Sequence, residues 1–106
     1  MLKINNIVNN NGNKVANQFV IYDDIKGEKH FQSYNSLVCI VSHTKNTIIF
    51  GRDWDYSNTT MRHLRKFLQD EANIDLNSTG IRKAIKLGSV ENRFCIYTVE
   101  YKEGLK

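Results

Sequence analysis

Side chains that could do chemistry are densest around position 54, where two carboxylates flank an indole in the run Asp53-Trp54-Asp55-Tyr56. An Asp-x-Asp spacing can hold a divalent cation when further carboxylates converge on it. The next acidic residue in the sequence is Asp70, so we predict no metal site here. Two interpretations remain open. Trp54 and Tyr56 either pack a junction between a strand and a helix, with the aspartates favouring the helix N-terminus, or they form a binding surface.

The histidines and cysteines do not assemble a catalytic or metal-binding motif. Cys39 and His43 have a metal-like spacing, but no second pair completes a tetrahedral site. Cys39 and Cys95 lie inside apolar runs, so we expect buried thiols that pack as small hydrophobes. His63 falls on the flank of a predicted helix, where it could contact anions. Since the sequence contains neither a nucleophile elbow nor a glycine-rich phosphate loop, we expect no enzyme, no cofactor and no metal.

Basic side chains gather between positions 61 and 87, where the sequence has six basic residues and three acidic ones. We expect any anion-binding surface to lie there. The residues concerned are Arg62, Arg65, Lys66, Arg82, Lys83 and Lys86.

These basic residues fall on two predicted helices that are followed by a strand, an arrangement that faintly resembles a helix-turn-helix with a wing. A recognition helix carrying Arg82, Lys83 and Lys86 could meet phosphates or base edges. The joining segment, residues 73–77, is longer than the usual turn of that motif and lacks its glycine. A solvated helix face is the alternative explanation of these charges.

The elements that position these residues begin with strands. Strand-like runs cover residues 2–8, 15–22, 29–34, 36–41 and 47–51. Residues 9–13 contain Asn-Gly, a strong hairpin signal because both residues tolerate positive φ. The run 36–41 is apolar on both faces and should be central. We therefore predict an antiparallel meander.

A helical period replaces the strand pattern after residue 56. Ser57 is the predicted N-cap, which places Tyr56 and Met61 at the positions of a hydrophobic staple. A second helix is expected from Asn77 or Ser78 to Gly88, followed by a strand over residues 92–101. The inner faces of the two helices should be formed by Met61, Leu64, Phe67 and Leu68, and by Ile81, Ala84 and Ile85.

The expected order is thus βββββ-αα-β, a single α+β domain over residues 1–106. It should consist of an antiparallel sheet with two helices packed on one face. The 106 residues are 41% hydrophobic and 25% charged, as in ordinary globular proteins. No apolar run approaches the roughly 18–20 residues that span a bilayer, and the first residues turn to asparagine too early for a signal peptide. We expect a cytoplasmic protein without membrane contact.

Two further motifs are Ser33-Tyr34-Asn35-Ser36 and Asp53-Trp54-Asp55-Tyr56-Ser57-Asn58-Thr59-Thr60. They resemble a group of small proteins from phages, prophages and plasmids of Gram-positive and related AT-rich bacteria. The similarity covers residues 33–70, with a leucine-rich helix behind the second motif. The group has no established activity. The resemblance implies an accessory protein of a mobile element, and such proteins commonly bind host machines, including restriction and CRISPR effectors.

We therefore predict a non-enzymatic phage-type protein that binds and inhibits a host defence or nucleic-acid-handling complex, with an anti-CRISPR protein as the best specific form. Its partner would be a host protein or ribonucleoprotein, with nucleic acid as a further contact. A net charge of +4 argues against an acidic DNA mimic. It favours contact with guide RNA, bound DNA or an acidic protein surface. The alternative is a small DNA-binding regulator that uses the second helix.

Overall fold

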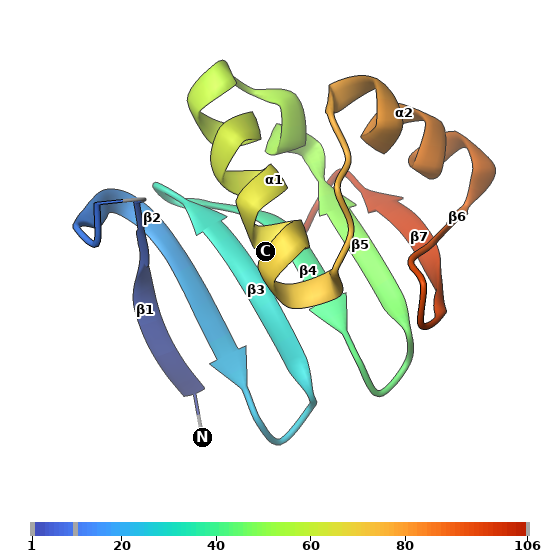
Figure 1. Ribbon diagram of the computed structural model, residues 1–106, viewed down its shortest axis with the longest axis horizontal. Helices are drawn as coiled ribbons and strands as arrows, with labels where there is room; N and C mark the ends of the chain where they lie inside the picture. Colours follow the sequence, from blue (N-terminus) through green and yellow to red (C-terminus); the bar gives the residue numbers. More distant parts are fainter. Residues whose placement is uncertain (1, 10, 106) are drawn as a thin grey trace.

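Within the described residues, seven strands form one mixed sheet in the order β1-β2-β3-β4-β5-β7-β6, and α1 and α2 lie on the same face of it (Figure 1). The structure, a computed structural model, describes residues 2–9 and 11–105, so Asn10 of the predicted first turn lies outside it. The α+β class is confirmed. The elements are β1 (Leu2–Val8), β2 (Lys14–Asp23), β3 (Glu28–Ser33), β4 (Ser36–Ser42), β5 (Thr47–Gly51), the 3₁₀ turn η1 (Arg52–Asp55), α1 (Asn58–Ala72), α2 (Ser78–Leu87), β6 (Ser89–Glu91) and β7 (Ile96–Lys102).

The predicted meander is confirmed, because each strand from β1 to β5 pairs antiparallel with the next. Its up-and-down course brings the β1–β2 hairpin, the β3–β4 turn and η1 to the same end of the sheet. In the hairpin, Asn9 Oδ1 accepts the backbone N–H groups of Asn11 and Asn13, and Gly12 takes a φ of 81°. The middle of β4 is buried, as expected for a central strand.

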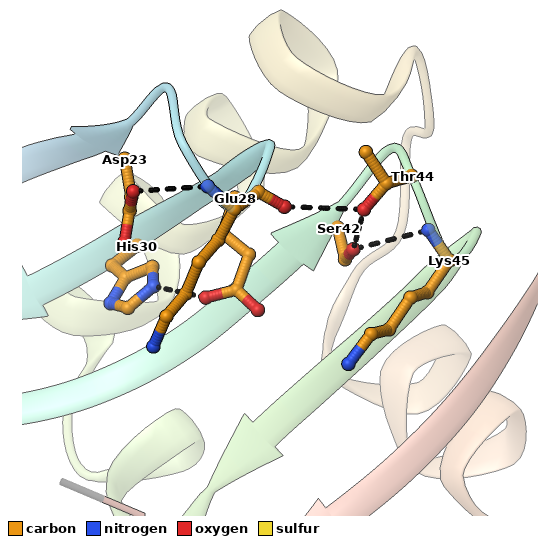
Figure 2. Close-up of polar contacts among 7 residues, drawn as sticks. Asp23, Glu28, His30, Ser42, Thr44 and Lys45 are labelled. Atoms are coloured by element: carbon orange, nitrogen blue, oxygen red, sulfur yellow. Dashed lines mark hydrogen bonds and ion pairs between the residues drawn. The ribbon is translucent and has the colours of Figure 1, made fainter. Parts of the chain in front are cut away.

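The opposite end of the sheet is braced by side chains that link neighbouring turns (Figure 2). The Thr44 hydroxyl donates to the Lys26 carbonyl at 3.2 Å, which ties the β4–β5 turn to the β2–β3 turn. The Ser42 hydroxyl oxygen accepts the backbone N–H of Lys45 at 3.2 Å, and His30 Nε2 lies 3.0 Å from a carboxylate oxygen of Glu28. The first two contacts hold the β4–β5 turn and join it to the β2–β3 turn.

The prediction for the C-terminal part is wrong in two respects. Residues 92–101 do not form one strand, because Asn92 Oδ1 accepts the backbone N–H groups of Phe94 and Cys95 and turns the chain. The short strand β6 precedes this turn and pairs antiparallel with β7. In addition, β7 runs parallel to β5, so the sheet is not wholly antiparallel. The two helices form the long crossover that a parallel pair requires.

Both helices begin at predicted capping residues, and α2 also ends at its predicted one. The backbone N–H of Thr60 donates to Ser57 Oγ at 3.1 Å, and that of Gly80 donates to Asn77 Oδ1 at 2.8 Å. Gly88 ends α2 in the left-handed conformation. The hydrophobic staple is not formed in the expected way, since Tyr56 is 78% exposed.

The core lies between the sheet and the two helices. Leu64, Phe67 and Leu68 are buried as predicted, whereas Met61 is half-buried. The Phe67 ring stacks on Phe31 of β3 with 5.7 Å between centroids. From α2, Ile81 and Ala84 are buried and Ile85 packs against their edge.

Within residues 2–9 and 11–105, no helix has the length and apolar character needed to cross a membrane.

Candidate functional site

A groove of about 820 Å³ lies between α1 and the β1–β2 hairpin, and we call it the α1 groove. Its lining combines three cations, one imidazole, four amides and three apolar side chains, without a carboxylate. The lining residues are Val8, Asn9, Asn11, Val15, Asn58, Met61, Arg62, His63, Arg65, Lys66 and Gln69. The groove therefore offers positive charge beside hydrogen-bonding amides.

The cations of the α1 groove keep the capacity to meet an anion. Arg65 Nη2 donates to Asp75 Oδ1 at 3.0 Å, and Lys66 pairs with Asp70 at 3.3 Å, one helical turn away. Exposed pairs of this kind contribute only about 0–1 kcal/mol, so an incoming phosphate can replace the carboxylate. Arg62 is exposed and has no ion pair within the part of the chain that the structure describes. The hydrogen bond from Arg65 lowers the pKa of Asp75, which keeps that carboxylate ionised.

His63 was expected on the flank of the helix, where it could contact anions, but its side chain is only 8% exposed where it lines the groove. Burial lowers the pKa of His63, and the neighbouring Arg62 lowers it further. Both effects penalise the charged imidazolium. His63 is therefore a neutral hydrogen-bonding group at pH 7 rather than an anion-binding cation.

This lowered pKa predicts a loss of stability in mild acid. As the pH falls through the ordinary histidine pKa of 6.5, His63 of the unfolded chain takes up a proton before His63 of the folded chain does. The free energy of unfolding should therefore rise with pH across this window. Urea denaturation at about pH 5.5 and about pH 7.5 measures the effect. The unfolding free energy of the variant His63→Gln should depend less on pH. The control is His43→Gln, at an exposed position in the β4–β5 turn. An unchanged pH dependence in His63→Gln would contradict this assignment.

The basic residues of α2 do not join the α1 groove. Arg82 Nη2 donates to Asp55 Oδ2 at 3.2 Å, and the guanidinium lies 5.3 Å from the centroid of the Trp54 ring. Lys83 and Lys86 are exposed, and Lys83 borders a separate, largely apolar groove. The structure thus brings together the three predicted cations of α1 and leaves those of α2 apart.

Trp54 and Tyr56 have different environments. Trp54 is 6% exposed, and its ring meets Phe50 edge-on with 6.4 Å between centroids. This supports the packing interpretation for Trp54. Tyr56 is exposed and belongs to the surface.

The two aspartates of the same run point to separate partners. Asp53 Oδ2 accepts the Ser36 hydroxyl at 2.7 Å, whereas Asp55 pairs with Arg82. Across the described residues, no group of three histidine, cysteine or acidic side chains could hold a metal ion. The thiol of Cys39 is fully buried, and burial raises its pKa, which keeps it protonated and inert.

The two motifs singled out in the sequence meet in space. The β3–β4 turn and the junction between η1 and α1 line a cavity of about 570 Å³, which we call the hydroxyl cavity. Sequence reasoning missed this pairing, although the up-and-down course of a meander places both motifs at the same end. It also treated Asn9 and Asn11 only as turn residues, whereas both line the α1 groove.

Comparison with known proteins places the chain in a family. A family of unknown function, DUF8033, matches residues 2–85. The matched range contains every residue that lines the α1 groove and the hydroxyl cavity. The comparisons with curated proteins and with solved structures found no match. Because the match covers well over half of its length, the chain belongs to the DUF8033 family.

Proposed function

We propose that the chain is a non-enzymatic accessory protein of a mobile element that binds and inhibits a host defence or nucleic-acid-handling complex. It would act in the host cytoplasm, and inhibition of a CRISPR effector is the best specific form of the proposal. The observation that carries it is the α1 groove, where Arg62, Arg65 and Lys66 stand beside four amides with no carboxylate on the lining. In this proposal the groove contacts nucleic acid that the complex holds.

The chemistry of the α1 groove suits a nucleic-acid strand. Arginine and lysine position a protein on phosphates, and asparagine and glutamine amides pair with base edges. A net charge of +4 gives little electrostatic attraction for bare DNA. The groove would therefore add to contacts with a protein partner rather than act alone.

The proposed origin of the chain in a mobile element is supported by a separate observation. The motifs at residues 33–36 and 53–60 resemble small proteins of phages, prophages and plasmids. Accessory proteins of this kind commonly act by occupying a host machine, and surface occupation requires no catalytic group.

A DNA-binding regulator that uses α2 is the second candidate. Exposed Lys83 and Lys86 favour it. Against it, the groove that Lys83 borders is lined, among the described residues, by the carboxylate of Glu91 and by no amide side chain, and Arg82 also contacts Trp54 and Asp55 of its own protein. We therefore favour the α1 groove over α2.

Matched charge removals on the two helices test this choice. We expect the double variant Arg62→Ala/Lys66→Ala to weaken capture of the host complex by about tenfold or more, because hydrogen bonds to charged groups contribute about 1.5–3 kcal/mol each. The control Lys83→Ala/Lys86→Ala removes the same charge and should have little effect. Copurification from host lysate, with and without nuclease, gives the measurement. A larger loss from the α2 pair would overturn the assignment of the groove.

A further inference from the structure

The hydroxyl cavity differs from the α1 groove in the sign of its charge. Its lining includes five serine and threonine hydroxyls, two tyrosines, one asparagine and one valine. Among the described residues, Asp53 is the one carboxylate on this lining, and none of the lining residues carries a positive charge. A cavity with this lining favours a positively charged ligand that donates hydrogen bonds.

Asp53 keeps acceptor capacity for such a ligand. Its Oδ2 accepts the Ser36 hydroxyl, and its Oδ1 lies 3.4 Å from Nε of Arg52, a long contact from a side chain that is 68% exposed. A carboxylate offers about four lone-pair sites, so these two contacts leave room for further donors. The Ser36 contact also orients the carboxylate.

An exposed tyrosine from each motif borders the cavity. Tyr34 is 60% exposed and Tyr56 is 78% exposed, although both line it. Tyr34 adopts a φ of 55°, which is unfavourable for an aromatic residue, and its backbone N–H donates to the Asn17 carbonyl at 2.6 Å. The fold therefore holds an aromatic ring at the rim in a conformation that its local sequence does not prefer.

The same stretch of chain already binds one guanidinium. Trp54 and Asp55 hold Arg82 through ring stacking and a carboxylate contact. Asp53 and Tyr56 repeat this combination on the cavity. They are three residues apart in the chain, and the Tyr56 N–H donates to the Asp53 carbonyl at 3.2 Å.

We propose that the hydroxyl cavity binds the guanidinium group of an arginine side chain presented by the protein partner. The guanidinium would donate to Asp53 and to the neighbouring hydroxyl oxygens while it lies against the tyrosine rings. Arginine fits better than lysine, because its planar fork stacks on aromatic faces and reaches several acceptors at once.

This inference rests on the proposed function for the source of the arginine. Ser57 and Thr59 line the hydroxyl cavity, while Asn58 and Met61 line the α1 groove. The first turn of α1 thus separates a site for a cation from a site for anions. Arginine and phosphate lie side by side wherever a protein binds nucleic acid, so the two sites together match the surface of a nucleoprotein.

A titration with a small probe tests the cavity without any host complex. N-acetyl-arginine amide is added to the full chain, and backbone amide chemical shifts are followed by NMR. We expect shifts at residues 33–36 and 53–60, with the lysine derivative binding several-fold more weakly. The variant Asp53→Asn, which keeps an acceptor for Ser36, should bind about tenfold more weakly or worse. Tyr56→Ala should also weaken binding, whereas Asp75→Asn, which removes a carboxylate outside the cavity, should not.

Two results would overturn the inference. One is equal binding of the neutral citrulline derivative, which would show that positive charge is not recognised. The other is stronger displacement of the same amides by guanosine monophosphate, which would assign the cavity to a base instead. Since the probe is a single amino-acid derivative, a negative result rejects the cavity site alone, whereas failed copurification of the host complex rejects the proposed function alone.

Discussion

Replacing Trp54 with alanine should lower the free energy of unfolding by about 3–5 kcal/mol. The indole is almost fully buried, contacts Phe50 edge-on and carries the guanidinium of Arg82, so the truncation removes several contacts and leaves a cavity. Urea denaturation monitored by far-UV circular dichroism measures the loss.

The neighbouring aromatic residue provides the control for this prediction. Tyr56 is exposed, so Tyr56→Ala should change the free energy of unfolding by less than about 0.5 kcal/mol. If Trp54→Ala were as stable as the wild type yet failed to capture the host complex, Trp54 would be a contact residue and its packing role would be rejected.

Truncating Leu68 should have a comparable effect, with a loss of about 2–5 kcal/mol in Leu68→Ala. Leu68 is fully buried on the inner stripe of α1, between the helix and the sheet. The cost depends on how far the surroundings collapse into the space left by the side chain. Thermal and urea unfolding of the purified variant both report it.

Met61 belongs to the same helical stripe but is half-buried, so Met61→Ala should cost clearly less than Leu68→Ala. Equal losses of unfolding free energy at the two positions would contradict the difference in burial between Met61 and Leu68. A loss below about 1 kcal/mol in Leu68→Ala would contradict its place in the core.

Local sequence features predicted the elements that have strong local causes. Ser57 and Asn77 cap their helices because a short oxygen-bearing side chain satisfies a free N–H of the first turn. The first five strands followed from their apolar runs and from turns rich in asparagine and glycine. The end of α2 at Gly88 was also predicted, because glycine readily adopts the left-handed conformation that ends a helix.

The first error is a missed local turn, and the second is a pairing between strands that lie far apart in the sequence. β6 is three residues long, too short for a recognisable alternation, and it pairs with β7 through the tight turn that begins at Asn92. The parallel pairing of β7 with β5 depends on the crossover formed by both helices. The parallel pairing therefore has no signature within the β7 segment itself.

The candidate sites show the same division between local and distant causes. The basic residues of α1 were recognised from the sequence because they share a helix face. The pairing of Arg82 with Asp55 was not, since the two side chains are 27 positions apart and meet only after α2 packs beside η1. The hydroxyl cavity likewise exists only because the meander returns residues 33–36 to the junction at residues 53–60.

A single salt titration tests the central claim most directly, with binding to random-sequence duplex and to a purified nucleic-acid-loaded effector complex measured side by side. We expect weak duplex binding, with a dissociation constant of roughly 10⁻⁴–10⁻⁶ M at physiological salt, and much tighter binding to the complex. The variant Arg62→Ala/Lys66→Ala should flatten the log–log salt dependence of complex binding by about two units. Nanomolar, sequence-selective binding to bare duplex that is lost in Lys83→Ala/Lys86→Ala would contradict the account and establish a DNA-binding regulator instead.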